Sequence, residues 1–290
     1  MVKKISQLYL ETRRDLARKE DMDTAGFMAR NIIAAITGRS QEKLIADFDQ
    51  PATEKECAEV AMAVWRAQTG EPLAYILGEW DFYGMHLYVD KSVLIPRDDT
   101  CAVTELAIKK GLFLDAAPRI LDLCTGSGCI GLAIAHRVKD AKVTLADISK
   151  DALAVAKKNI TRQKLSGRVS CFQADAMAEA PAFLGKFDLI VSNPPYITTN
   201  EMQQLPNSVK DYEPHVALFG GDDGLDFYRA IAKNYQKALK PHGYLCFEFG
   251  MGQGDDVCRI LEANGYTILE RARDYNDRER AVLAQSRKDD

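Results

Sequence analysis

The sequence lacks any run of about 18 uncharged apolar residues, which is the length that a membrane-spanning helix needs. Its first residues lead into a polar, helix-patterned stretch without the apolar segment of a secretory signal. These two absences predict a cytoplasmic protein that has no membrane partner.

Histidine is scarce, and the cysteines are not spaced for a metal site or a disulfide framework. Four histidines occur in 290 residues, and none has a second histidine or cysteine at the spacing of metal ligands. The seven cysteines are odd in number and contain no Cys-x-x-Cys pair. We therefore expect reduced, mostly buried cysteines and no metal cofactor.

The chain also has no strong excess of positive charge. Its formal net charge is −4, which argues against binding nucleic acid by neutralising phosphates. A protein or small-molecule substrate is the better expectation, and no direct sequence-specific nucleic-acid binding is expected. The 47% hydrophobic content and the length suit one large α/β domain and a smaller one.

Helical patterning dominates the N-terminal part. Apolar residues recur at helical spacing to about residue 68, and polar breaks near 21–24, 38–41 and 49–53 separate several helices. We predict a helical domain over residues 1–70, which either packs on its neighbour or docks substrate. Residues 75–89 are rich in aromatic and β-branched side chains around two glycines, which predicts a β-hairpin linker within 71–98.

Short apolar runs alternate with helical stretches from residue 119 onward. Such alternation is typical of βαβ units around a parallel sheet, so residues 99–290 are predicted to form an α/β domain. The predicted strands are 119–123, 142–147, 168–172, 187–192 and 243–249, and the predicted helices lie near 129–137, 150–164 and 224–239. Two further strand candidates, 266–271 and 280–283, could form an antiparallel edge.

A glycine-rich loop, residues 124–131, follows the first of these strands. Glycines in such a turn let the backbone approach a ligand and aim helix N–H groups at it. Gly126, Gly128 and Gly131 satisfy Gly-x-Gly-x-x-Gly, and Asp147 ends the next strand. This pattern alone fits a nicotinamide dehydrogenase or an S-adenosylmethionine site, because both need an acid for the ribose hydroxyls. Asp147 could instead cap the helix that follows it.

Four residues directly after the strand 187–192 carry the strongest chemical signal: Asn193, Pro194, Pro195 and Tyr196. We call them the Asn-Pro-Pro-Tyr motif. Both prolines fix φ and lack N–H groups, so the carbonyls of the turn are acceptors without neighbouring donors. A planar NH2 group could donate to the Asn193 side chain and the Pro194 carbonyl while it packs on Tyr196. Asn193 and Pro194 are thus the catalytic candidates, with Tyr196 as a platform.

This motif favours a methyl donor over a nicotinamide. A dehydrogenase would need a proton relay such as a positioned histidine or a Tyr/Lys pair, and we can nominate none. Asp175 follows the third strand, where it could bind an adenine or serve as a plain turn residue. Asn193 follows the fourth strand, beside the expected position of a sulfonium.

Together these motifs resemble one family. The chain is similar to the HemK-like protein N5-glutamine methyltransferases in the glycine-rich loop, in residues 147–153, in the Asn-Pro-Pro-Tyr motif, in Glu213-Pro214 and in residues 221–229. The likeness extends upstream through 71–78 and 93–97. It implies a Rossmann-like class I S-adenosylmethionine-dependent methyltransferase sheet, a small N-terminal helical domain and a β-hairpin linker.

The resemblance also implies a reaction and a set of site residues. S-adenosylmethionine would methylate the glutamine of a Gly-Gly-Gln motif in peptide chain release factors, which are the expected partners. By this resemblance the glutamine amide would bind at the Asn-Pro-Pro-Tyr motif, the ribose at Asp147, and the adenine near Asp175 and Ala176. The methionine part of the cofactor would bind at the glycine-rich loop, with Asn193 nearby. The loop residues concerned are Cys124, Thr125, Gly126, Ser127 and Gly128.

Two positions depart from the family pattern. Asp98 and Asp99 stand where the family commonly has Pro-Glu, so no detailed role is predicted for that loop or for Arg97. Cys124 stands where the family commonly has glycine, and we therefore expect a negative φ there.

Three alternatives remain open from the sequence. The same motif would fit an exocyclic amine of a nucleic-acid base, although such an enzyme should show a basic groove and a base-flipping pocket. A sister enzyme that acts on a glutamine of a large-subunit ribosomal protein would share nearly every motif. A non-catalytic cofactor-binding scaffold predicts a damaged motif or loop, and both are intact.

Overall fold

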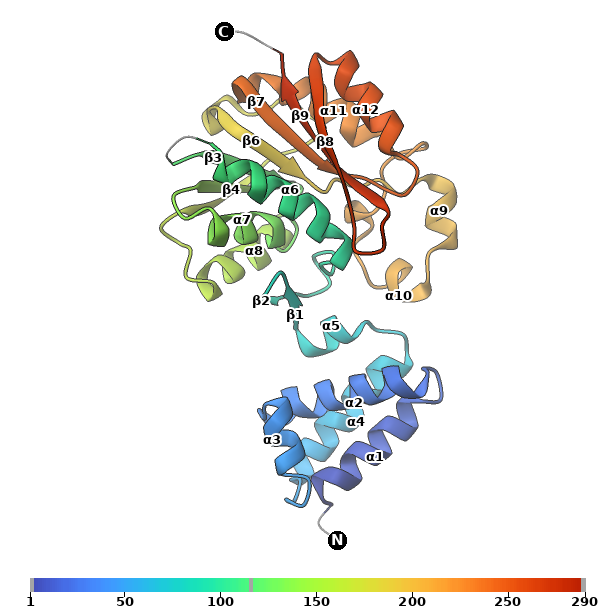
Figure 1. Cartoon of the computed structure of the whole chain (residues 1–290). Helices are drawn as coiled ribbons and strands as arrows, with labels where there is room; N and C mark the ends of the chain where they lie inside the picture. The colour runs from blue at the N-terminus through green and yellow to red at the C-terminus, as the bar shows by residue number, and fades with distance from the viewer. Residues whose placement is uncertain (1–2, 115–116, 288–290) are drawn as a thin grey trace. The chain divides into compact units, whose positions relative to one another are not determined.

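The structure is a computed structural model that describes residues 3–114 and 117–287 (Figure 1). These residues form two compact units. One contains the chain up to Glu79 together with Asn207–Tyr212, and the other contains Trp80–Pro206 and the chain from Glu213 onward. No pattern in the sequence predicts that residues 207–212 belong with the N-terminal helices. Within the described ranges, no helix is both long and apolar enough to cross a bilayer.

The first unit is helical. Its helices are α1 (Ile5–Leu16), α2 (Met22–Thr37), α3 (Gln41–Ala46), α4 (Glu54–Gln68), α5 (Leu73–Leu77) and the short α10 (Asn207–Lys210), and α2, α3 and α4 begin at the predicted polar breaks. Asp21, Ser40 and Thr53 lie in the predicted breaks, and each side chain accepts a backbone N–H at a helix start. Apolar residues such as Ile32 and Ile33 are fully buried between these helices.

The predicted hairpin linker is only partly right. A short helix, α5 (Leu73–Leu77), comes first and ends at Gly78, whose φ of +75° is the left-handed conformation common after helices. The hairpin itself is β1 (Glu79–Phe82) and β2 (Met85–Tyr88), which form a separate two-stranded sheet.

The second unit is built on a seven-stranded sheet of order β5-β4-β3-β6-β7-β9-β8. Its strands are β3 (Arg119–Leu123), β4 (Lys142–Asp147), β5 (Val169–Gln173), β6 (Phe187–Ser192), β7 (Leu239–Glu248), β8 (Tyr266–Arg273) and β9 (Glu279–Ser286). The strands from β5 to β7 in this order pair in parallel, and β9 pairs antiparallel with β7 and β8. The predicted parallel sheet with an antiparallel edge is confirmed.

Helices cover both faces of this sheet (Figure 1). Side chains alternate between the two faces, so Leu189 and Val191 on β6 pack on one side and Ile190 on the other. The first face carries α6 (Cys101–Leu112), α7 (Cys129–Arg137) and α8 (Lys150–Arg162); the second carries α11 (Asp226–Asn234) and α12 (Gly254–Ala263). The helix predicted at 224–239 is therefore too long, because the 3-10 turn Gln236–Ala238 and the start of β7 occupy its last part.

The topology brings two loops together. Leu123, the last residue of β3, pairs with Ala146 on β4 and with Ser192 on β6. The loops after β3 and β6 therefore begin side by side, where the strand order reverses direction. In open α/β sheets this switch point, at the carboxyl ends of the strands, is where ligands bind.

Gly131 allows α7 to lie close to the sheet. A Cβ at this position would lie 2.3 Å from Leu145 Cδ2 and 2.9 Å from Asp122 Oδ2. We expect Gly131→Ala to lower the free energy of unfolding by about 1–3 kcal/mol, because the buried neighbours leave no room for a methyl group. Urea denaturation measures this. Gly167→Ala is the control, since no atom lies within 4 Å of its added Cβ; equal stability of the two variants would contradict the account.

Candidate active site

A cavity of about 240 Å³ lies at the carboxyl ends of the central strands. This is several times the ~30 Å³ that one water molecule occupies in the liquid, so the cavity is large enough for a small molecule. Four groups of residues line it: residues 92–94, Pro96 and Thr100 before α6, the glycine-rich loop with the start of α7, the segments that follow β4 and β5 together with Asp147, and Asn193 with Pro195 after β6. Val216, Ala217 and Phe227 complete the wall.

The glycine-rich loop presents backbone to this cavity. Of the five loop residues predicted to bind cofactor, all but Gly128 line it. The Thr125 hydroxyl donates to Asp122 Oδ2 over 2.6 Å, which fixes the loop to β3. Gly126 has a φ of +52°, and an added Cβ there would meet no atom within 4 Å, so the backbone is open to a ligand at this point.

The prediction of a negative φ at Cys124 is wrong. Its φ is +59°, in the left-handed region that non-glycine residues occupy at a cost of about 1–2 kcal/mol. The turn requires this conformation, because the chain must bend so that the Thr125 N–H donates to the Ala146 carbonyl over 3.0 Å. Cys124 therefore keeps the backbone conformation that glycine would adopt easily.

Asp147 lines the cavity and does not cap the helix after it. Ser149 is the N-cap of α8, because its hydroxyl accepts the Ala152 N–H over 3.1 Å. Asp147 Oδ2 accepts the Gly126 N–H and Oδ1 accepts the Ser149 N–H, each over 2.9 Å. A carboxylate oxygen can accept two hydrogen bonds, so both oxygens retain capacity for ligand hydroxyls. Burial raises the pKa of Asp147.

Asp175 lies at the cavity and also holds the turn that follows β5. It lines the cavity together with Ala176, and its Oδ1 also accepts the Met177 N–H over 2.8 Å, which stabilises the turn after β5. The hydroxyl of Tyr235 donates to the Asp175 carbonyl over 3.0 Å and ties this turn to the end of α11.

The Asn-Pro-Pro-Tyr motif is divided between the cavity wall and the interior. Asn193 and Pro195 line the cavity, whereas Pro194 is buried and Tyr196 is half-buried outside the lining. The Asn193 side chain donates from Nδ2 to Thr100 Oγ1 over 3.3 Å. Burial raises the pKa of Tyr196 far above its ordinary value, so its hydroxyl stays neutral.

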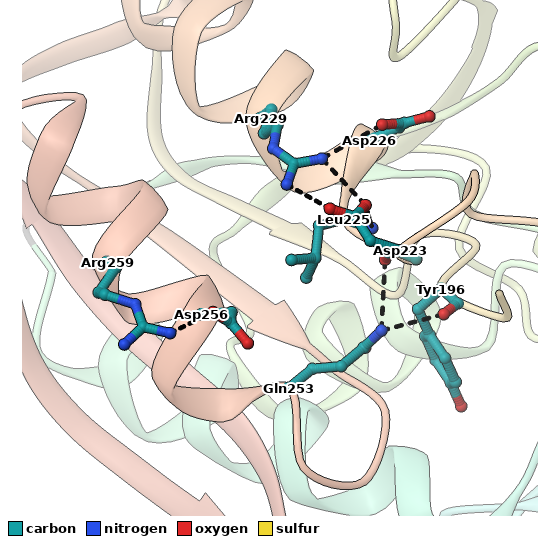
Figure 2. A network of polar contacts seen from close by, with 9 residues as sticks. Tyr196, Asp223, Leu225, Asp226, Arg229, Gln253, Asp256 and Arg259 are labelled. Atoms are coloured by element: carbon teal, nitrogen blue, oxygen red, sulfur yellow. Dashed lines mark hydrogen bonds and ion pairs between the residues drawn. The ribbon is translucent and has the colours of Figure 1, made fainter.

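Gln253, which does not line the cavity, hydrogen-bonds to the Asn-Pro-Pro-Tyr motif (Figure 2). Its Nε2 donates to the Tyr196 carbonyl over 3.1 Å and to the Gly224 carbonyl over 3.4 Å. A Cβ at Gly224 would lie only 2.3 Å from the Tyr196 carbonyl oxygen, so the two segments touch directly. Figure 2 also shows Arg229 paired with Asp223 and Asp226, so these carboxylates of the acidic stretch 222–226 are held in ion pairs.

Three residues without a predicted role shape the edge of the cavity. The Arg97 guanidinium donates to the buried carboxyl group of Glu213, whose pKa is raised by burial. This ion pair anchors the segment 213–217, which supplies Val216 and Ala217 to the wall. His215 is exposed, and its ring lies 5.5 Å from that of Phe219. These contacts give Arg97, Glu213 and His215 a structural role in the loop.

Sequence reasoning missed the apolar part of the wall. Val93 and Leu94 before α6, Ile148 after Asp147 and Phe227 on α11 all line the cavity. Ile148 offered a signal, since it is an apolar residue in a surface turn directly after an acidic residue that ends a strand. Its side chain is 47% exposed, a surface that a bound ring system could cover.

Asp122 makes the stability depend on pH. It is 1% exposed, and burial raises its pKa to about 7. The folded state therefore holds this proton to a higher pH than the unfolded chain, so the free energy of unfolding falls as the pH rises from about 4 to about 7. Comparing wild type with Asp122→Asn by urea denaturation at about pH 5 and about pH 8 isolates this contribution. We expect the variant to gain stability relative to wild type at the higher pH; a difference that does not change with pH would contradict the assignment.

Two solved structures share the fold of this chain. The hMettl16 catalytic domain, solved in complex with MAT2A 3′UTR hairpin 6, matches with a TM-score of 0.57 and 15% identity over 83% of this chain and 86% of that one. A methyltransferase from Pyrococcus furiosus matches with a TM-score of 0.50 and 16% identity over 80% and 98%. The chain thus has the fold of class I methyltransferases, with the cavity at the switch point of its sheet.

Sequence relatives identify the family. The profile of the Methyltransferase small domain matches residues 105–208, and that of the PrmC N-terminal domain matches residues 7–78. The Release factor glutamine methyltransferase of Geobacter sulfurreducens is 38% identical over 93% of each chain, and that of Clostridium acetobutylicum is 44% identical over 73% of this chain and 74% of its own. The chain belongs to the release factor glutamine methyltransferase family.

Proposed function

We propose that this protein transfers a methyl group from S-adenosylmethionine to the side-chain amide nitrogen (N5) of the glutamine in the Gly-Gly-Gln motif of peptide chain release factors. One observation carries the proposal: Asn193 of the Asn-Pro-Pro-Tyr motif lines the same cavity as the glycine-rich loop and Asp147. An acceptor for a planar amide thus adjoins a site for a nucleoside-containing ligand. Membership of the family supports the choice of substrate.

The residues around the cavity fit S-adenosylmethionine. Asp147 has free acceptor capacity for the ribose hydroxyls, and Asp175 and Ala176, which line the same cavity, are proposed to contact the adenine. The Ser127 hydroxyl is buried in the wall and makes no hydrogen bond within the described residues. The open backbone at Gly126 leaves room for the methionine part. When bound, this cofactor supplies an electrophilic methyl group.

The chain contributes orientation and electrostatics. A glutamine amide nitrogen is a poor nucleophile, because its lone pair is delocalised into the carbonyl group. In the proposed complex Asn193 Oδ1 and the Pro194 carbonyl accept its two N–H groups, and Tyr196 packs on its plane. Two accepted hydrogen bonds hold the amide in one orientation and favour positive charge on its nitrogen. No strong general base is needed, since the proton can leave after the transfer.

The helical unit is proposed to dock the protein substrate. Its exposed apolar side chains, which include Phe27, Met62 and Trp65, give it surface for a protein partner. The second unit without the helical unit should then methylate short Gly-Gly-Gln peptides and intact release factor at similar rates. The whole chain should methylate the intact factor faster than the peptides.

A transfer assay tests the function. Labelled S-adenosylmethionine is incubated with the protein and a purified release factor, beside a factor whose Gly-Gly-Gln glutamine is changed to alanine. We expect label on the wild-type factor only. Equal label on both factors would show that another residue is methylated, and label on neither, with cofactor binding intact, would redirect the search to ribosomal proteins and then to nucleic acid.

A further inference from the structure

A buried carboxyl group lies behind the Asn-Pro-Pro-Tyr motif. Glu248 is the last residue of β7, and the residue before it, Phe247, pairs with Ser192 at the end of β6. Glu248 and Asn193 therefore follow paired positions on neighbouring strands. Glu248 is 1% exposed and does not line the cavity. A buried carboxyl group costs folding free energy, so its presence calls for a role.

The contacts of Glu248 lead to the Asn193 amide. Burial raises the pKa of its carboxyl group, whereas hydrogen bonding to the side chains of Thr100 and Asn193 lowers it. Asn193 Nδ2 also donates to Thr100 Oγ1 over 3.3 Å. Its second oxygen, Oε2, makes no hydrogen bond within the described residues. The guanidinium of Arg280 is paired instead with Asp99 over 2.8 Å and Asp274 over 3.2 Å. Among the described residues Glu248 therefore forms no ion pair, although the charge of Arg280 also favours its ionised form.

These contacts determine which way the Asn193 amide points. A side-chain amide has a donor end and an acceptor end, and neighbouring groups decide its orientation. An ionised carboxylate can only accept hydrogen bonds, so it selects the Nδ2 end. Oδ1 then faces away, and no described residue hydrogen-bonds to it. This is the oxygen that the proposed mechanism needs as acceptor for the substrate.

We infer that Glu248 is a positioning residue for methyl transfer: together with Thr100 it holds the Asn193 amide so that Oδ1 faces the substrate amide. This inference rests on the proposed function. The negative charge behind Asn193 also polarises its amide and strengthens Oδ1 as an acceptor. In Glu248→Gln the side-chain amide could donate as well as accept hydrogen bonds. It would therefore no longer select the Nδ2 end of the Asn193 amide.

The pH dependence of Glu248 ionisation provides a way to test its effect on Asn193. Burial raises its pKa to about 7, so protonation near neutral pH converts it from an acceptor into a donor. The other charged or titratable groups that act on it or are acted on by it are Asp99, Cys101, Cys129, Tyr196, Tyr228 and Arg280. The pKa values of the cysteines, the tyrosines and Arg280 are raised, so the cysteines and tyrosines stay neutral and Arg280 stays positively charged near neutral pH. Asp99 is held in its ion pair with Arg280.

Steady-state kinetics on the full chain test the inference. We expect Glu248→Gln to lower kcat about 10- to 100-fold while KM for cofactor and release factor stays within about threefold. The variant should be no less stable than wild type in urea, and the ratio of wild-type to variant kcat should rise between about pH 6 and about pH 8. Glu270→Gln, an exposed Glu→Gln change on β8, should leave kcat unaltered.

A second variant separates positioning from general damage. Thr100→Val removes the hydroxyl between Asn193 and Glu248 while keeping the side-chain shape. Because both residues act on one amide, the double variant should be little slower than the slower single variant. Three results would each overturn the inference. The effects of the two single substitutions on kcat could multiply in the double variant, or Glu248→Gln could keep the wild-type kcat. The third is a loss of kcat that is fully explained by a loss of folded protein. A wild-type enzyme that leaves release factor unlabelled would instead count against the proposed function.

A spectroscopic measurement tests the contact without any turnover. The side-chain NH2 signal of Asn193, assigned in a ¹H–¹⁵N spectrum by its loss in Asn193→Asp, should shift as the pH passes through about 7. The shift should vanish in Glu248→Gln and persist in Glu270→Gln. A signal that ignores both the pH and the Glu248 substitution would refute the inference even if the substrate were a different protein.

Discussion

Asn193→Ala should abolish methyl transfer, with a loss of about 100-fold or more in kcat. The substitution removes the side-chain acceptor that orients the substrate amide, whereas the glycine-rich loop and Asp147 remain. The dissociation constant for S-adenosylmethionine should therefore stay within about tenfold of wild type. Single-turnover transfer to release factor measures the first quantity, and calorimetric titration measures the second.

The control for this prediction is Asn200→Ala, the same change at an exposed position on α9 (Thr199–Gln204). It should leave both kcat and cofactor affinity unaltered. If Asn193→Ala lost cofactor binding altogether, its main role would be in the cofactor site. If it retained wild-type turnover, the motif would not be the acceptor for the substrate.

Asp147→Ala should raise the dissociation constant for S-adenosylmethionine about 10- to 100-fold, because hydrogen bonds from neutral hydroxyls to a carboxylate are worth about 1.5–3 kcal/mol. The change also removes the acceptor for the Gly126 and Ser149 N–H groups, so circular dichroism and urea denaturation must accompany the titration. Asp151→Ala, an exposed carboxylate in the first turn of α8, is the matched control and should bind cofactor as wild type does. Equal affinities of the two variants would remove Asp147 from the cofactor site.

Most of the fold could be predicted because its elements have local signatures. The strands 119–123, 142–147 and 187–192 were predicted with the observed limits, since continuous apolar runs mark strands buried on both faces. The boundaries of a helix or strand do not follow from the sequence alone where the intrinsic propensity of the residues conflicts with tertiary packing. The β-favouring stretch 75–89 predicts a hairpin, yet its first three residues, 75–77, lie in the short helix Leu73–Leu77 that Gly78 ends.

The candidate site was predictable only where residues adjacent in sequence carry the chemistry. The loop and the Asn-Pro-Pro-Tyr motif are such segments. Glu248 and Gln253 are not, because each acts on the motif from a strand or loop more than 50 residues away. Cys124 was predicted wrongly because a local preference is overruled by a contact with a neighbouring strand. A cysteine side chain favours a negative φ, but the hydrogen bond from the Thr125 N–H to the Ala146 carbonyl requires the left-handed turn.

The most direct test of the central claim is tandem mass spectrometry of release factor after reaction with this protein and S-adenosylmethionine. The account predicts one added methyl group on the side-chain amide of the Gly-Gly-Gln glutamine, formed by the wild type and absent with Asn193→Ala. A methyl group on any other residue, or an unmodified factor from an enzyme that binds cofactor, would contradict it.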